Sequence, residues 1–360
     1  MVGISLLTLV PGVVGGSETY ARELVRALAR VGELDYRVFV PTVAEDAADG
    51  LPSRTVRAYR AGRSMPTRIA AMGLAAAVPG PVRRQLELDS LDAIHFPLSV
   101  MLPPVSHPPA ATTVLDVQHE LYPQFFSRAE LAYRRAVYGW TVRRSQIVIT
   151  ISQHAARGLV ERLGLDPARV RPIHLGIDHS VFRPGDEPRE DFLLYPALPW
   201  PHKNHARLFE AFAAVRARRP GLRLVLTGWD KPAPKGVEAR GHVPRDELVR
   251  FYRRAAALVF PSLYEGFGQP PLEAMACGCP VACSNAASLP EVVDDAARLF
   301  DPESVEDMAA AIEEVLDAPA EWTRRGLERA QLFSWDECAR RHEDVYRELA
   351  ACVDYGVGRG

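Results

Sequence analysis

The chain has 360 residues, of which 48% are hydrophobic and 24% are charged, and its formal net charge is −2. This length exceeds one ordinary domain core, so we expect two domains, and the average composition excludes a disordered chain, a fibre or a small disulfide-stapled protein. The small net charge provides no general attraction to nucleic acid.

The chain begins with an apolar segment at residues 4–10, which predicts a strand. No basic segment precedes it, although a secretory signal peptide begins with one. The longest weakly polar run, residues 69–79, is too short to span a bilayer. We therefore expect a cytoplasmic protein that does not cross a membrane and whose contact with the inner face of the cell membrane would be peripheral.

In the first half, short apolar runs alternate with longer amphipathic segments, a pattern typical of βα units and a parallel sheet. Strands are expected at residues 4–10, 36–40, 93–95, 112–115, 147–151 and 170–173. Helices are expected at residues 19–31, 129–144 and 154–163. Residues 175–189, which contain Pro184, Gly185 and Pro188, interrupt the pattern and predict a hinge.

A second series of the same kind follows the hinge. Strands are expected at residues 192–195, 222–227, 256–260, 280–284 and 297–300, and helices at 205–219, 245–255, 271–277 and through 305–351. The pattern predicts an α/β fold of two Rossmann-like domains that face each other across a cleft, with C-terminal helices closing the chain. We expect domains at 1–175 and 176–335, and a helix at 336–360 that crosses back to the first domain.

Five cysteines, Cys277, Cys279, Cys283, Cys338 and Cys352, are scattered without a CxxC pair or a nearby histidine at zinc-ligand spacing. They are expected to be small buried side chains in a reducing compartment.

A glycine pair, Gly15 and Gly16, joins the first expected strand to the first long helix. Glycines allow a tight turn and a close approach of the backbone to a bound group, and the helix start offers free N–H groups to an anion. The segment lacks the GxGxxG dinucleotide pattern. It is either an anion-binding loop or a purely structural turn.

Lysine is rare in this chain, because only 3 of the 43 basic residues are lysines. One of them, Lys203, lies between His202 and Asn204, where the first strand of the second series leads into a helix. A lysine amine is a compact point charge suited to a phosphate at such a position. The alternative is a solvated surface lysine.

The segment from Phe260 to Met275 is the most informative. A loop containing Glu265, Gly266 and Gly268 follows a strand, and Glu273 lies in the next helix with seven residues between the two glutamates. We expect both carboxylates at one strand-end crevice, where carboxylates accept hydrogen bonds from paired hydroxyls and glycine amides hold a sugar or phosphate oxygen. The alternative for Glu273 is that it only complements the helix dipole.

Together these segments resemble family 4 glycosyltransferases, the retaining enzymes of two-Rossmann (GT-B) type in the glycosyl transferases group 1. The resemblance rests on the two glutamates, on Lys203-Asn204 and on Gly15-Gly16, with further matches at residues 145–152, 175–178 and 274–281. It covers nearly the whole chain in the expected order.

The resemblance implies a nucleotide-sugar site. Glu273 would bind the ribose hydroxyls, Glu265 would face the transferred sugar, and Lys203 with the glycine loop would neutralise the diphosphate. The residues implied in donor binding are Gly15, Gly16, His202, Lys203, Gly228, His242, Val243, Glu265, Gly266, Phe267, Gly268 and Glu273, of which Gly228, His242 and Val243 would line the base pocket. The residues implied in catalysis are Glu265, Lys203, His119 and Asp116. No metal and no cofactor are implied.

Two positions depart from the family pattern. Leu198 stands where members often carry an arginine, five residues before Lys203, so the diphosphate would depend more on Lys203 and backbone amides. Leu115-Asp116 stands where many members have a His-Asp pair, and His119 follows three residues later. His119 either takes the place of that histidine or is a solvent-facing or structural hydrogen-bonding residue.

The resulting functional hypothesis is retaining transfer of a hexose or deoxyhexose, mannose or rhamnose, from a nucleotide-diphosphate sugar to a saccharide or lipid-linked acceptor in polysaccharide or glycoconjugate biosynthesis. Glu265 is not assigned as a nucleophile, since the resemblance implies front-face attack. Alternatives are a nucleotide-sugar epimerase, a glycan phosphorylase and a non-catalytic nucleotide-sugar-binding subunit. A phosphorylase would need a lysine for pyridoxal phosphate, and no lysine follows Lys235.

Residues 54–84 contain seven arginines and no acidic residue, with the apolar segment 69–78 among them. Such a segment is either a membrane contact for anionic lipid headgroups or a solvated face beside a core helix.

Overall fold

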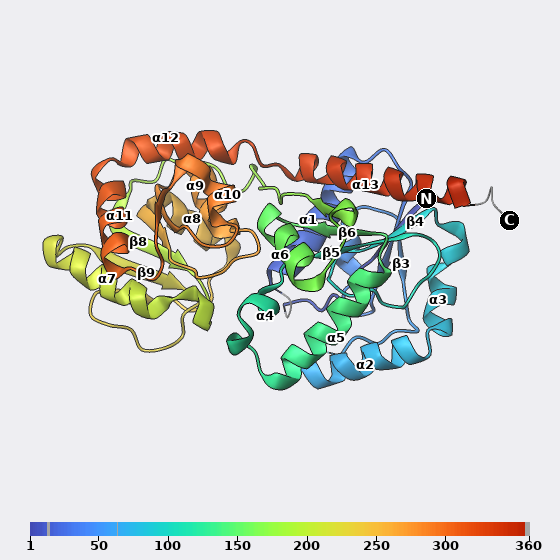
Figure 1. The fold of residues 1–360 in the computed structure, drawn as a ribbon. Helices are drawn as coiled ribbons and strands as arrows, with labels where there is room; N and C mark the ends of the chain where they lie inside the picture. Colours follow the sequence, from blue (N-terminus) through green and yellow to red (C-terminus); the bar gives the residue numbers. More distant parts are fainter. Residues whose placement is uncertain (13–14, 63, 357–360) are drawn as a thin grey trace. The chain divides into compact units, whose positions relative to one another are not determined.

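The computed structural model describes residues 1–12, 15–62 and 64–356, and its backbone divides into two compact units (Figure 1). Unit 1 comprises residues 1–175 together with the C-terminal residues from 335 onward, and unit 2 comprises residues 176–334. Each unit is built around one parallel sheet with helices packed on it.

The sheet of unit 1 has seven parallel strands in the order β3-β2-β1-β4-β5-β6-β7. The strands are β1 (Val2–Ser5), β2 (Tyr36–Val40), β3 (Ser53–Thr55), β4 (Ala93–Phe96), β5 (Ala110–Val114), β6 (Ile147–Thr150) and β7 (Val170–Pro172). Strand order reverses between β1 and β4, and such a switch point is where doubly wound sheets bind ligands.

Helices and short turns connect these strands, because neighbouring parallel strands need a crossover connection. Those of unit 1 are α1 (Gly16–Val31), α2 (Met65–Ala77), α3 (Gly80–Leu86), α4 (Gln118–Leu121), α5 (Arg128–Arg144), α6 (Gln153–Leu163) and α13 (Trp335–Gly356). Short 3₁₀ turns are η1 (Glu45–Ala48), η2 (Leu88–Ser90), η3 (Pro123–Phe125) and η4 (Pro167–Arg169).

The C-terminal helix α13 packs against α1 (Figure 1) and is joined to the sheet by buried polar side chains. The Tyr20 hydroxyl lies 2.8 Å from both Thr113 Oγ1 and His342 Nε2. His95 in β4 lies 2.8 Å from the Tyr346 hydroxyl through Nδ1 and 2.8 Å from Thr113 Oγ1 through Nε2. Because each buried polar atom has a partner, the network fixes how α13 docks on unit 1.

The sheet of unit 2 has six parallel strands in the order β10-β9-β8-β11-β12-β13. The strands are β8 (Glu190–Pro196), β9 (Arg223–Thr227), β10 (Val237–Ala239), β11 (Ala255–Phe260), β12 (Val281–Ser284) and β13 (Arg298–Phe300). The order reverses between β8 and β11, which places the switch point where their carboxyl ends lie side by side.

The helices of unit 2 are α7 (His205–Arg218), α8 (Arg245–Arg254), α9 (Gln269–Ala276), α10 (Leu289–Val293), α11 (Val305–Asp317) and α12 (Pro319–Ala330), with 3₁₀ turns η5 (Pro201–Lys203) and η6 (Asp294–Ala296). Unit 2 follows the strand order of a dinucleotide-binding Rossmann domain. The predicted α/β class with two Rossmann-like domains and helical C-terminal segments is thus confirmed. Their arrangement across a cleft stays a prediction.

The predicted first strand, residues 4–10, was wrong in its extent, because β1 ends at Ser5. Leu6, Leu7 and Leu9 are nevertheless fully buried, so their apolar run reflects burial of an irregular segment and not strand pairing. The strands β3 and β10 were not predicted. Each has three residues and none is buried, so neither shows an apolar period.

Four of the cysteines, Cys277, Cys279, Cys283 and Cys338, are free and buried as predicted. The Cys352 side chain lies outside the described residues. No helix in the described ranges is both long enough and apolar enough to cross a membrane.

Candidate active site

An ion pair marks the switch point of unit 2. Lys203 ends the 3₁₀ turn that follows β8, and Glu265 lies in the loop that follows β11. Lys203 Nζ lies 2.5 Å from Glu265 Oε1, and the two side chains are only 13% and 14% exposed. The two charges that the sequence singled out therefore meet at the edge of the sheet where a ligand is expected.

Asn204 fixes the loop that carries Lys203. Its backbone is left-handed, with φ of 58°, a conformation that asparagine tolerates better than most residues. Its side-chain amide donates to the carbonyls of Pro261, at 3.1 Å, and Pro302, at 2.8 Å. One buried side chain thus joins the loops that follow β8, β11 and β13.

Two further hydrogen bonds hold the same loop. The buried Tyr195 hydroxyl donates to the Lys203 carbonyl at 2.6 Å. The Leu263 N–H donates to the His202 carbonyl at 2.8 Å. His202 is therefore held through its backbone, and its ring lies 5.6 Å from the ring of the exposed Trp200. The backbone of Lys203 is consequently fixed, and its amine is held by Glu265.

The loop after Glu265 is shaped by one buried serine and one glycine. The Ser288 hydroxyl lies 2.9 Å from the Glu265 carbonyl and 2.7 Å from the Phe267 carbonyl, and it is fully buried. Gly268 has φ of 116°, and a Cβ there would lie 2.7 Å from Leu289 Cδ2. Only glycine fits this position, directly before α9.

Replacing Ser288 with alanine is expected to lower the free energy of unfolding by about 1–3 kcal/mol, because the two loop carbonyls lose the single hydroxyl proton that they share. Chemical denaturation would measure the change, with Ser106→Ala as the control because Ser106 is exposed. Equal stability of the Ser288→Ala and Ser106→Ala proteins would contradict the role given to Ser288.

Glu273 lies in α9 and makes a different contact. The Tyr252 hydroxyl donates to Glu273 Oε2 at 2.9 Å. Burial raises the pKa of Glu273 to about 7, although the Tyr252 hydrogen bond and the charge of Arg245 act in the opposite direction. Glu273 makes no hydrogen bond or ion pair with Lys203 or Glu265 within the part of the chain that the structure describes. That both carboxylates face one ligand stays a prediction.

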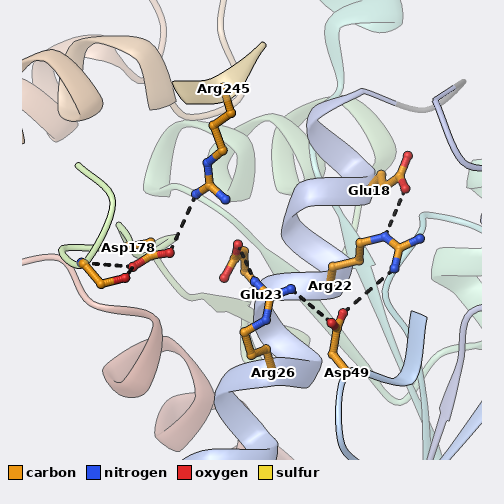
Figure 2. A network of polar contacts seen from close by, with 8 residues as sticks. Glu18, Arg22, Glu23, Arg26, Asp49, Asp178 and Arg245 are labelled. Carbon is orange, nitrogen blue, oxygen red and sulfur yellow. Dashed lines mark hydrogen bonds and ion pairs between the residues drawn. The ribbon is translucent and has the colours of Figure 1, made fainter. Parts of the chain in front are cut away.

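Arg245, at the start of α8, also lies 3.9 Å from Asp178 Oδ2 (Figure 2). Asp178 belongs to the predicted hinge, and its Oδ1 accepts from the Ser180 N–H at 3.0 Å and from the Ser180 hydroxyl at 2.5 Å. Burial raises the pKa of Asp178, but these hydrogen bonds and Arg245 together lower it below its ordinary value. Asp178 is therefore ionised at neutral pH and holds the first residues of unit 2 in place.

The loops predicted to line a base pocket meet at the same edge of the sheet. The Gly228 N–H, after β9, donates to the Gly241 carbonyl, after β10, at 2.5 Å. Gly228 has φ of 79°, and a Cβ there would lie 3.2 Å from the Ala197 carbonyl carbon, after β8. His242 is exposed and Val243 is half-buried. These positions are compatible with base contacts, which stay a prediction.

In unit 1, Gly15 precedes α1 with φ of 53°, and Gly16 begins the helix. The Glu18 carboxylate accepts from the Gly12 N–H at 2.8 Å and from Arg22 Nε at 3.0 Å (Figure 2). A Cβ at Gly15 or Gly16 would meet no described atom within 4 Å, so contacts with the described residues do not explain the glycine at position 16. A helix start that is not crowded by described side chains suits a bound anion. Residues 13 and 14 of this loop lie outside the described residues.

The arginines of α1 continue this network. Arg26 Nη2 lies 3.0 Å from Asp49 Oδ1, and Arg26 Nη1 lies 2.9 Å from Glu23 Oε1 (Figure 2). The ion pair with Asp49 joins the middle of α1 to the segment that follows β2.

His119 and Asp116 lie beyond the carboxyl end of β5. His119 is fully buried in the short helix α4, with its ring edge-on to Tyr138 at 5.2 Å. Neither ring nitrogen has a hydrogen-bond partner among the described residues, and burial lowers the pKa of His119, which favours the neutral ring at neutral pH. Asp116 Oδ1 accepts from the Gln118 N–H at 3.0 Å. Contact between His119 and a ligand would require this turn to move, and the catalytic roles of both residues stay predictions.

Sequence reasoning did not identify Tyr252 or Ser288, although they hold Glu273 and the Glu265 loop. Nothing in the sequence marks them, because Tyr252 is distant in the chain from Glu273 and Ser288 is distant from Glu265. The structural role of Asn204 could have been predicted, since asparagine is common at turn positions with a left-handed backbone.

In the described ranges no three His, Cys, Asp or Glu side chains cluster as metal ligands would.

Sequence comparison gives two family matches. The model of the family described as glycosyl transferases group 1 matches residues 181–331, and that of Glycosyltransferase Family 4 matches residues 14–181. The two matches run without a gap from residue 14 to residue 331.

Curated relatives include O-antigen chain mannosyltransferase B of Escherichia coli, which is 28% identical over 269 residues, or 67% of this chain and 70% of the relative. The MMP alpha-(1->4)-mannosyltransferase of Mycolicibacterium hassiacum is 29% identical over 225 residues, or 57% of this chain and 55% of the relative. The matched part thus spans about half the length of the second relative.

Among solved structures, sucrose-phosphate synthase from Thermosynechococcus elongatus is similar with a TM-score of 0.73 and 20% sequence identity. The similarity covers 98% of this chain and 99% of that one. At this identity the likeness establishes the fold alone.

Proposed function

The chain belongs to the group 1 glycosyl transferases of glycosyltransferase family 4, with a fold of GT-B type, and from this membership we propose that it transfers mannose with retention. The donor is a nucleotide-diphosphate sugar, and the acceptor is a saccharide or a lipid-linked saccharide in polysaccharide or glycoconjugate biosynthesis. The observation that carries this proposal is the Lys203–Glu265 pair at the switch point of unit 2.

The geometry supports a division of roles among the site residues. The Lys203 amine exchanges part of its contact with Glu265 for the donor diphosphate, and Glu265 faces the transferred sugar. The ionised Glu273 accepts hydrogen bonds from the ribose hydroxyls. The backbone N–H groups before α9, at Gly266 and Gly268, contact the sugar or a phosphate oxygen. The base lies against the loops at Gly228 and 241–243.

Charge development in the transition state explains why a fixed cation is needed. As the bond to the diphosphate breaks, negative charge grows on the leaving phosphate while the sugar becomes cationic. Lys203 and the N-terminus of α7, which directly follows it, stabilise that charge. This proposal requires no metal. Glu265 is not assigned as a nucleophile, because the family resemblance implies front-face attack without a covalent intermediate.

Mannose is preferred over rhamnose because two relatives of this chain are named mannosyltransferases. The enzyme is placed in the cytoplasm, in keeping with four free buried cysteines. It works at the inner membrane face when the acceptor is lipid-linked.

Thermal unfolding in the presence of donors tests the proposal, because a ligand that binds only the native state raises the melting temperature. We expect GDP-mannose to raise it more than UDP-glucose or dTDP-rhamnose, also with EDTA present. Product analysis with a saccharide acceptor should then show mannose in the α-configuration of the donor. Turnover of donor without any acceptor would favour an epimerase, and binding without turnover across an acceptor panel would favour a non-catalytic subunit.

A further inference from the structure

The helix α2 of unit 1 has an apolar surface that faces solvent. Of the six large hydrophobic side chains recorded as exposed in the described ranges, three lie within ten residues of one another: Ile69 is 41% exposed, Leu74 is 68% exposed and Val78 is 55% exposed. The intervening Ala70, Gly73, Ala76 and Ala77 are exposed as well. Residues 65–77 contain a single charged residue, Arg68.

The opposite side of α2 packs against the rest of unit 1. Ala75 belongs to the hydrophobic core of unit 1, and Ala71 and Met72 pack against that core. The Tyr133 hydroxyl of α5 lies 3.7 Å from Met72 Sδ, and α5 runs beside α2 (Figure 1). The exposed side chains are therefore not needed to hold the helix. A soluble surface would carry polar residues on this face.

Arginines flank this apolar segment on both sides along the chain. Arg57 and Arg60 precede α2 and Arg84 follows it, and all three are exposed. None of the three forms an ion pair with another described residue, whereas Arg54 is paired with Glu87. No acidic residue lies between positions 54 and 84. The positive charge is local, because the chain as a whole has a net charge of −2.

We propose that α2 docks unit 1 on an anionic phospholipid surface, with Ile69, Leu74 and Val78 entering the headgroup–acyl boundary and Arg57, Arg60 and Arg84 contacting lipid phosphates. The exposed apolar side chains are flanked in the chain by cations and by no acidic residue, a combination that fits an anionic lipid surface better than the mixed polar rim of a protein interface. The inference deepens the proposed function, because a lipid-linked acceptor lies at such a surface.

Vesicle co-sedimentation without donor or acceptor tests the proposal. The full chain should bind vesicles that contain phosphatidylglycerol and not vesicles of phosphatidylcholine alone, and binding should weaken as salt screens the charges. Arg57→Ser/Arg60→Ser should weaken binding by about 30-fold, since each cation near the surface contributes a factor of about five. Leu74→Glu should weaken it by roughly tenfold or more.

Matched controls use equally exposed residues elsewhere. Arg157→Ser/Arg162→Ser on α6 removes the same charge, and Leu332→Glu changes a leucine that is 69% exposed. Both controls should bind as the parent does, and all variants should keep the donor-dependent thermal shift, which separates this inference from the proposed function. Absent vesicle binding, or binding that the α2-region variants leave unchanged, would overturn it. So would a dimer in light scattering that Leu74→Glu abolishes, because a second copy would then be the occupant.

Discussion

Replacing Lys203 with alanine is expected to lower kcat by about 100- to 1,000-fold, which corresponds to about 2.7–4 kcal/mol of transition-state stabilisation. The amine is the group that the structure holds at the switch point of unit 2, 2.5 Å from Glu265. Leu198, 47% exposed, occupies the position of a family arginine and supplies no charge. The loss should therefore appear mainly in kcat, with a smaller change in KM, in steady-state assays with saturating donor.

The variant also removes the partner of a largely buried carboxylate, so its stability must be measured with its activity. Truncating one member of such a pair leaves an uncompensated charge. The double variant Lys203→Ala/Glu265→Gln avoids that charge and should unfold closer to the parent temperature while remaining inactive. Lys203→Arg should recover only part of kcat, because a planar guanidinium differs in shape from an amine.

Lys235→Ala is the matched control, because Lys235 is an exposed lysine of the same unit. Its kcat should stay within about twofold of the parent value, as expected for surface substitutions. A Lys203→Ala protein that is folded and turns over as fast as Lys235→Ala would remove Lys203 from the mechanism.

The meeting of Lys203 and Glu265 could be predicted from sequence, because both follow parallel strands. The carboxyl ends of parallel strands lie at one edge, and the order of the βα units places β8 beside β11. A residue directly after each strand is thereby confined to a small region. The strands could be predicted from their short apolar runs, and β2 was predicted with its observed bounds.

The partner of Glu273 could not be predicted, because Tyr252 reaches it from α8 through helix packing. Hydrophobic period predicts that α8 has a buried face, but not which side chain of that face meets a carboxylate. The case of His119 is similar. Its sequence neighbours indicate a loop, whereas burial beside Tyr138 depends on how α5 packs over the turn.

Replacing Glu273 with glutamine is expected to abolish the donor-dependent thermal shift while stabilising the empty protein above pH 7. Burial raises the pKa of Glu273 from 4.5 to about 7, so the folded protein binds a proton there that the unfolded chain has lost. The free energy of unfolding therefore falls as pH rises from 4.5 to about 7, by up to about 3 kcal/mol. A neutral glutamine removes this dependence.

The same titration controls donor binding in the parent protein. Ribose hydroxyls donate hydrogen bonds, and the ionised carboxylate accepts them best, so donor affinity should fall by about tenfold for each pH unit below 7. Tyr252→Phe is the sharper control, because it keeps the carboxylate and removes a hydrogen bond that favours its ionised form. Its affinity profile should shift to higher pH, as isothermal titration calorimetry would show. The raised pKa of Glu273 predicts a change of donor affinity in roughly the range from pH 5 to pH 8. A donor affinity that does not change over this range would show that the ribose does not bind Glu273.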